Sequence, residues 1–204
     1  MAVYSEIGDL EAVILHTPGC EVENMTPENA ERALYSDILN LSVAREEYSE
    51  LRGVLDKMTK TFQVKDLLRE TLQDEAIKRE LVDEICEREG SGNIKRYLFS
   101  LDSDELATQL IEGVPLKRKT LTDYFSPERY SLRPLHNFFF TRDASVSLGN
   151  HVLINKMAST VRSRESLIME TIFNHSSMVS GDTINPIRRK HCPDDLTIEG
   201  GDVL

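Results

Sequence analysis

The chain has 204 residues, of which 40% are hydrophobic and 29% are charged, and its formal net charge is −11. This size and balance allow one domain, or a domain with a smaller insertion, that buries a core of its own. The acidic charge argues against a nucleic-acid partner, because phosphate binding requires a basic face. No stretch approaches the roughly 18 apolar residues of a membrane span, so we expect no membrane partner.

The three cysteines are odd in number and widely spaced, which argues against a disulfide framework or a zinc knuckle. They are Cys20, Cys86 and Cys192. The first ten residues also lack the basic-then-apolar pattern of a secretory signal. We therefore expect a cytoplasmic protein with reduced cysteines.

The first third of the chain predicts a strand at 12–15, where a short apolar run is closed by a Pro-Gly pair. Thr26 and Pro27 indicate a helix start, because a capping hydroxyl precedes a proline suited to the first helical position. A longer helix is predicted to begin near Ser42, and a second strand at 61–64. The apolar face expected for that helix consists of Ala44, Tyr48, Leu51, Leu55 and Met58.

From 66 to 112 the pattern changes to charged, amphipathic helices. Asp74 is a candidate cap for one helix, and Gly90 is a natural stop for it. Asp102 and Ser103 are candidate caps for another helix. We interpret this stretch as a helical insertion.

Strand signals return in the last third, beginning with an aromatic run at 138–140. Two alternating segments, 144–148 and 151–155, are separated by a Gly-Asn pair, which predicts a β-hairpin. A helix is predicted at about 164–173. Val203 and Leu204 should lie within a strand, so we expect the sequence to be truncated.

Two acidic motifs are candidates for binding chemistry. Phe140-Thr141-Arg142-Asp143 could present a carboxylate beside an aromatic ring, a pairing that suits a guanidinium group. Glu199-Gly200-Gly201-Asp202 places carboxylates on both sides of a glycine pair that lets the backbone bend tightly. Each motif taken alone is also typical of an ordinary turn.

Together the two motifs resemble the arginine deiminase family, within the guanidino-group-modifying enzyme superfamily. Asn137 lies three residues ahead of the first motif, and the second follows some tens of residues later. The resemblance extends to the start of the chain and covers essentially all of it, aligned to the first half of the enzyme. The matching residues there are His16-Thr17-Pro18-Gly19, Glu21, Glu23-Asn24 and Thr26-Pro27.

The resemblance implies an α/β fold: part of a pentein-type α/β propeller, about the first two ββαβ blades, with an α-helical insertion. Residues 1–65 would form the first blade, 66–120 the insertion, and 121–204 the second blade with the truncated start of the next. An incomplete propeller leaves sheet edges unpaired, so we expect a homo-oligomer or other self-association.

The resemblance also assigns roles to individual residues. Asp143 and Glu199 would be catalytic carboxylates that hold the guanidinium, with Glu199 assisting proton transfer. Phe140 would pack against the substrate, and Asn137 would be a supporting contact. Arg162 would contact the α-carboxylate of the substrate. Arg164 is the alternative if the alignment is shifted; otherwise it would be a surface arginine at a helix start.

The family's covalent mechanism needs a cysteine nucleophile and a histidine, which the resemblance places beyond the Glu-Gly-Gly-Asp segment. Among the resident cysteines only Cys192 has a histidine neighbour, His191, but adjacent residues of an extended segment point to opposite faces. We therefore expect the isolated chain to lack the catalytic cysteine and histidine and to be inactive. Structural roles are expected for the remaining histidines, which are His16, His136, His151 and His175.

The parent enzyme is expected to hydrolyse L-arginine to L-citrulline and ammonia, with L-arginine as its small-molecule partner and without a metal or organic cofactor. Two alternatives remain open. One is a related deiminase or amidinotransferase that acts on another guanidine, such as agmatine or methylated arginine. The other is a non-catalytic guanidine-binding module.

Overall fold

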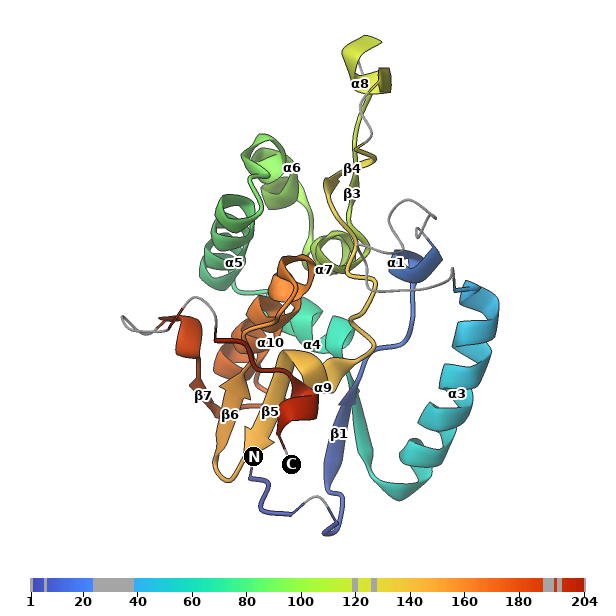
Figure 1. Cartoon of the computed structure of the whole chain (residues 1–204), viewed down its shortest axis with the longest axis vertical. Coiled ribbons are helices and arrows are strands. Elements are labelled where there is room, and N and C mark those ends of the chain that lie inside the picture. The colour runs from blue at the N-terminus through green and yellow to red at the C-terminus, as the bar shows by residue number, and fades with distance from the viewer. Residues whose placement is uncertain are drawn as a thin grey trace.

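The computed structural model describes residues 2–5, 7–23, 39–118, 121–125, 128–188, 193 and 196–203. Within these residues the protein is a mixed α/β structure with three small sheets and helices around them (Figure 1). The α/β class is therefore confirmed. No helix in this part of the chain is long and apolar enough to cross a membrane.

The first sheet is a parallel pair, β1 (Ala12–Leu15) and β2 (Lys60–Gln63), linked by α3 (Leu41–Met58). Both strands and the long helix were predicted. Asn40 caps the helix, since its side-chain oxygen accepts a hydrogen bond from the Ser42 amide at 2.9 Å. None of the residues of α3 is buried. The short α1 (Cys20–Glu23) follows β1, and the predicted helix start at Thr26 and Pro27 lies outside the described residues.

The predicted helical stretch is confirmed as a group of helices between β2 and the next sheet. The Asp74 carboxylate accepts from the Ala76 amide, and the Asp102 carboxylate accepts from the Glu105 amide, both at 2.8 Å. Both capping predictions are thus confirmed, with Ser103 as the first helical residue of the second helix. The helices are α4 (Val64–Thr71), α5 (Glu75–Arg88), η1 (Gly92–Ile94), α6 (Lys95–Ser100) and α7 (Ser103–Glu112).

An arm projects from this helical group (Figure 1). Its base is the antiparallel pair β3 (Val114–Pro115) and β4 (Tyr130–Leu132), and its tip carries α8 (Leu121–Phe125). Gly113, with φ of +85°, begins the arm where a side chain would collide with the backbone of Leu132.

The third sheet contains the predicted hairpin. Strands β5 (Ser145–Leu148) and β6 (His151–Ile154) pair antiparallel around Gly149, whose φ is +55°. Helix α10 (Ser163–His175) then crosses over to β7 (Asp182–Ile184), which pairs parallel with β6. The short strand β7 was not predicted.

The prediction of a strand at 138–140 is wrong. This aromatic run forms consecutive tight turns, in which the Phe140 amide donates to the Asn137 carbonyl at 3.0 Å and the Asp143 amide donates to the Phe140 carbonyl at 3.2 Å. The turns lead into α9 (Thr141–Ala144). At the end of the chain, Gly200–Asp202 form the 3-10 helix η4. The prediction of a strand is wrong for Val203, which lies in no strand, and Leu204 lies outside the described residues.

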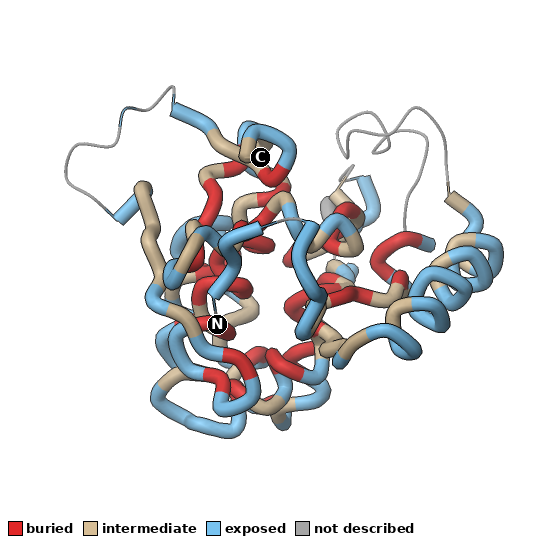
Figure 2. Tube along the Cα trace, turned by 90° about the horizontal axis from the view of Figure 1, so that it is seen from below, coloured by how far each residue is buried: buried red, intermediate tan, exposed pale blue. Residues whose placement is uncertain are grey.

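One hydrophobic core joins the helical group to the third sheet. Its buried members run from Val64 to Val179, and Leu67, Leu106, Phe138 and Ile168 are fully enclosed. Helix α10 packs against both α4 and α5. Figure 2 shows these buried segments gathered in the middle of the molecule, with exposed segments around them. The core therefore fixes the start of α10, where the candidate site lies.

Candidate functional site

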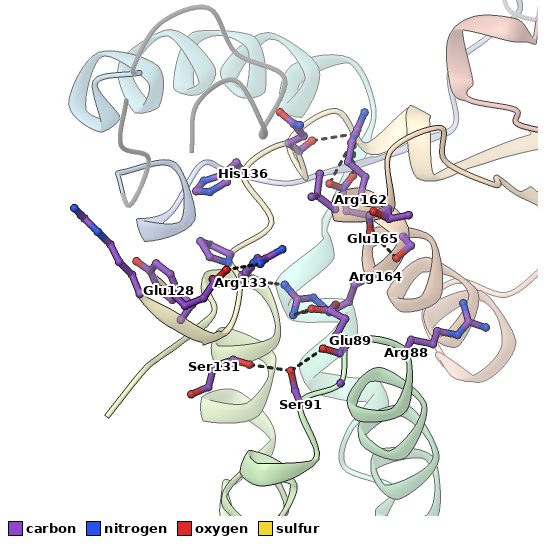
Figure 3. Close-up of a pocket in the computed structure, with 18 of the residues that line it drawn as sticks. Arg88, Glu89, Ser91, Glu128, Ser131, Arg133, His136, Arg162, Arg164 and Glu165 are labelled. Atoms are coloured by element: carbon purple, nitrogen blue, oxygen red, sulfur yellow. Dashed lines mark hydrogen bonds and ion pairs between the residues drawn. The ribbon is translucent and has the colours of Figure 1, made fainter. Parts of the chain in front are cut away.

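The centre of the site is the guanidinium of Arg162, which is shared by two carboxylates. Arg162 Nη1 lies 2.8 Å from Asp143 Oδ2, and Nη2 lies 2.8 Å from Glu165 Oε2. Arg162 Nε donates to both Glu165 oxygens at 3.2 and 3.1 Å, and Nη2 donates to the Asn137 carbonyl at 3.3 Å. Arg162 and Glu165 are 5% and 1% exposed and form the buried part of this ionic cluster (Figure 3).

The cluster contains one more negative charge than positive charge when both carboxyls are ionised. Burial raises the pKa of Glu165 to about 7; its hydrogen bonds with Arg162 oppose this rise, and the charge of Asp143 adds to it. Burial alone would lower the pKa of Arg162, but its hydrogen bonds to Glu165 and Asp143 raise it. Burial therefore outweighs the opposing effect of the two guanidinium groups near Glu165, those of Arg162 and Arg164.

Asp143 is held in place through the backbone of α9. The Asn155 side-chain amide donates to the Asp143 carbonyl at 2.8 Å, and the Thr141 hydroxyl donates to the Ile14 carbonyl at 3.1 Å. These bonds tie α9 to the end of β6 and to β1. The side chain of Asp143 remains 27% exposed, so its carboxylate can reach a ligand as well as Arg162.

The two acidic motifs are joined by Arg142. Its Nε donates to the Gly200 carbonyl at 3.1 Å, and its Nη2 donates to the Val203 carbonyl at 2.6 Å. A Cβ atom at Gly200 would lie 2.5 Å from the Arg142 carbonyl oxygen, so the close approach of η4 to α9 requires glycine there. The motifs, far apart in sequence, are therefore packed against each other.

The remaining predicted residues lie around this contact. Glu199 Oε1 accepts from the Ala158 amide at 3.0 Å, and the Glu199 amide donates to Asp202 Oδ2 at 2.9 Å, so Glu199 is held by its own turn and by the segment that follows β6. Phe140 is 49% exposed, and its ring centroid is 4.3 Å from that of Phe139. The structure thus brings Asn137, Asp143 and Arg162 together, and the described contacts of Glu199 go elsewhere.

Sequence reasoning missed two residues of the site, Glu165 and Asn155. Glu165 follows Arg162 by three positions at a helix start, a spacing at which opposite charges commonly meet, so this signal was present. Asn155 had no comparable signal. Arg164 is 3% exposed, so its interpretation as a surface arginine is wrong.

The described cysteines have raised pKa values, which disfavours the thiolate. Cys86 is buried in α5, and this burial raises its pKa. Cys20, at the start of α1, is exposed, and its partial desolvation together with the neighbouring Glu112 raises the pKa of its thiol. Cys192 lies outside the part of the chain that the structure describes. Across that part there is also no group of three or more histidine, cysteine, aspartate or glutamate side chains that could hold a metal ion.

The turn after β1 contains a buried pair, His16 and Glu21. His16 Nε2 lies 3.0 Å from Glu21 Oε1, which also accepts from the Gly19 amide at 2.7 Å. The His16 ring packs 5.2 Å from the ring of Phe138. His16 therefore has the structural role that was predicted, fixing the turn beside the aromatic run.

The fold and the cluster define an α/β protein in which one buried and one partly exposed carboxylate hold a buried guanidinium group. The family model for arginine deiminase matches residues 31–204, and the chain belongs to the arginine deiminase family. It is 35% identical to the arginine deiminase of Limosilactobacillus fermentum, over 99% of this chain and 52% of that protein. The corresponding enzymes of Pediococcus pentosaceus and Levilactobacillus brevis are 33% and 34% identical over 99% of the chain, which covers 52% and 53% of their lengths. The chain thus spans about half the length of the relatives that it matches.

Proposed function

We propose that this chain is the substrate-holding half of an enzyme that hydrolyses L-arginine to L-citrulline and ammonia. The observation that carries the proposal is the contact between the two acidic motifs through Arg142 and Gly200. Family membership supports it. The Asp143 carboxylate already holds one guanidinium, that of Arg162, at 2.8 Å, which is the interaction that an arginine substrate would need.

Each predicted residue has a place in this proposal. Asp143 would grip the substrate guanidinium, Glu199 would hold its other side and assist proton transfer, and the exposed ring of Phe140 would pack against it. Arg162 would turn from Asp143 toward the substrate's α-carboxylate. Asn137, whose carbonyl contacts Arg162, would support that movement.

The covalent step is proposed to use a cysteine and a histidine outside these 204 residues. In it a thiolate attacks the guanidinium carbon, ammonia leaves, and water activated by histidine releases citrulline. The raised pKa values of Cys20 and Cys86 support this, because a thiol that stays protonated is a poor nucleophile. The residues of this chain would bind and orient the substrate, and we propose no metal or organic cofactor.

We further propose that the chain forms part of a propeller. The order β5, β6, α10 and β7 follows the ββαβ pattern of one blade, within 121–204, and β1, α3 and β2 supply a βαβ unit within 1–65. The helices of 66–120 would be the insertion. A homo-oligomeric, cytoplasmic enzyme is the working proposal for the whole protein.

A chimaera tests the function directly. Residues 1–204 would replace the matching half of the Limosilactobacillus fermentum enzyme, and citrulline formation from L-arginine would be measured. We expect turnover that falls by at least about a hundredfold in Asp143→Asn and Glu199→Gln. Asp66→Asn, at an exposed carboxylate of α4, is the matched control and should retain turnover. A folded chimaera whose turnover is indifferent to Asp143 would contradict the proposal.

Two further measurements separate the alternatives. The purified 204-residue chain should form no citrulline, and formation there would refute the proposed origin of the nucleophile. In the chimaera, Arg162→Gln should impair turnover of L-arginine far more than that of agmatine, which lacks the α-carboxylate. Equal impairment would indicate that Arg162 serves the guanidinium end instead.

A further inference from the structure

A cavity of about 1110 Å³ lies between the start of α10, the end of α5 and the arm at β4 (Figure 3). Asn137, Arg162 and Glu165 form part of its wall, but Asp143, Phe140 and Glu199 do not line it. The cavity therefore adjoins the candidate site on the side away from Asp143. Its volume suits a small metabolite.

Arg164 is a buried cation in the wall of this cavity. The residue is 3% exposed, and its Nη1 is 3.4 Å from the carboxylate of Glu89, a long and weak contact. Its Nη2 donates to the Arg133 carbonyl. Nε of Arg164 has no hydrogen-bond partner among the described residues. A guanidinium has five donors, and leaving one buried and unpaired costs free energy, so this group is incompletely satisfied.

Five arginines and three glutamates line the cavity. Arg88, Arg133 and Arg162 have close acidic partners, which are Glu84, Glu128 and Asp143. The contact of Arg164 with Glu89 is longer, at 3.4 Å. Helix α10 also begins at this wall, and no side chain caps its first turn. A helix N-terminus attracts anions, and Arg164 is the second residue of this helix. Burial lowers the pKa of Arg164, although the charges of Glu89 and Glu165 oppose this change.

We propose that this cavity binds a small metabolite through a carboxylate or phosphate group, with the Arg164 guanidinium as the principal contact. The start of α10 lies beside Arg164 and would face the same group. Such an oxyanion would compete with Glu89 for Nη1 of Arg164, whose present contact is long, and Arg133 at the same wall would add positive charge. This site shares Asn137, Arg162 and Glu165 with the candidate site, but its principal contact, Arg164, has no role in the proposed arginine hydrolysis.

Thr160 provides a variant that does not disturb the core. It is exposed, lines the cavity and precedes α10, where an acidic residue is compatible with the helix. Thr160→Glu places a negative charge at the wall. Thr160→Gln introduces a side chain of nearly the same shape as glutamate but without its charge. Arg164→Gln removes the principal contact, and Arg52→Gln removes an arginine from the exposed surface of α3 as a control.

The experiment is isothermal titration calorimetry of the 204-residue chain at low salt, with inorganic phosphate and succinate as separate probes. We expect at least one probe to bind, with affinity lowered about tenfold or more by Arg164→Gln and about threefold by Thr160→Glu. Thr160→Gln and Arg52→Gln should bind as the wild type does. The two probes distinguish a phosphate from a carboxylate ligand.

Two results would overturn the proposal. One is the absence of binding by both probes to the wild-type chain. The other is equal binding by the wild type and Thr160→Glu, which stays informative even if Arg164→Gln does not fold. Because no step of the test involves L-arginine or its turnover, failure here and failure of the proposed enzyme activity are independent outcomes.

Discussion

At the scale of single residues, the guanidinium of Arg162 controls the charge of the candidate site. It is the nearest cation to both Asp143 and Glu165, and both carboxylates depend on it when they are ionised. Under the proposed function, an arriving substrate guanidinium would exchange with Arg162 at Asp143, while Glu165 keeps Arg162 nearby.

Replacing Glu165 by glutamine should change how stability depends on pH. The pKa of Glu165 is raised from 4.5 to about 7 in the folded chain, chiefly by burial. The folded state then binds more protons than the unfolded state between these values, so the contribution of Glu165 is complete below pH 4.5 and is lost as pH rises through 7. Between pH 4.5 and 7.5 the wild type should lose on the order of 3 kcal/mol more unfolding free energy than Glu165→Gln.

Urea unfolding at a series of pH values measures this difference. Glu75→Gln, at a glutamate whose side chain is 71% exposed, is the matched control and should follow the wild-type curve. Parallel curves for the wild type and Glu165→Gln would show that Glu165 keeps an ordinary pKa.

The neighbouring glycines of the second motif allow a direct test of the contact between the motifs. An alanine Cβ at position 200 would lie 2.5 Å from the Arg142 carbonyl oxygen, whereas at position 201 nothing lies within 4 Å. Gly200→Ala should therefore lower the unfolding free energy by about 2 kcal/mol. Gly201→Ala should leave it unchanged or slightly higher, because alanine restricts the unfolded chain. Equal effects of the two changes in chemical denaturation would show that η4 is not packed on α9.

Sequence alone pointed to Asn137, Asp143 and Arg162, which the fold does bring together, although their roles stay predictions. It could not show that Arg162 turns toward Asp143, because that contact depends on where the hairpin places the start of α10. For Arg164 the sequence leaves two interpretations open, an alternative to Arg162 or a surface arginine at a helix start. The packing of α10 against α5 and the bond of Arg164 to the Arg133 carbonyl show that it is buried.

At the scale of elements, local signals defined the helix starts well. The Asp74 carboxylate satisfies amides of the first turn of α5, including that of Ala76 at 2.8 Å. Asp74→Ala should lower the unfolding free energy by about 1 kcal/mol. Asp74→Ser should retain most of this stabilisation, because a serine side chain can also accept the capping hydrogen bonds. Thermal unfolding of both variants measures this, and equal losses would indicate that Asp74 acts through its charge rather than its hydrogen bonds.

Elements with local determinants were predicted, and elements set by tertiary contacts were not. The hairpin of β5 and β6 was identified because Gly149 and Asn150 form its turn, and α3 because its apolar residues repeat at helical spacing. The aromatic run 138–140 has strand-like composition, but Phe138 is drawn into the core beside His16, so the chain turns there. Strand β7 has three residues and is formed by pairing with β6.

At the scale of the whole molecule, the apolar residues of α3 are incompletely covered. Val54 and Met58 are 55% and 69% exposed, and Leu51 is 50% exposed. The sheet of β1 and β2 beside this helix has only two strands among the described residues. Exposed apolar surface next to an open sheet edge favours association, because burying it removes apolar area from water.

We therefore expect the 204-residue chain to self-associate in a concentration-dependent way. Sedimentation velocity should give a coefficient that rises over about a hundredfold range of concentration, as mass action requires. The double variant Val54→Glu and Met58→Glu should remain monomeric, because each substitution places a charge on the surface that would be buried. Glu47→Gln and Glu50→Gln in the same helix form the control and should associate as the wild type does. If the double variant associates equally, α3 is not the contact, and the exposed residues of the arm at α8 become the surface to test.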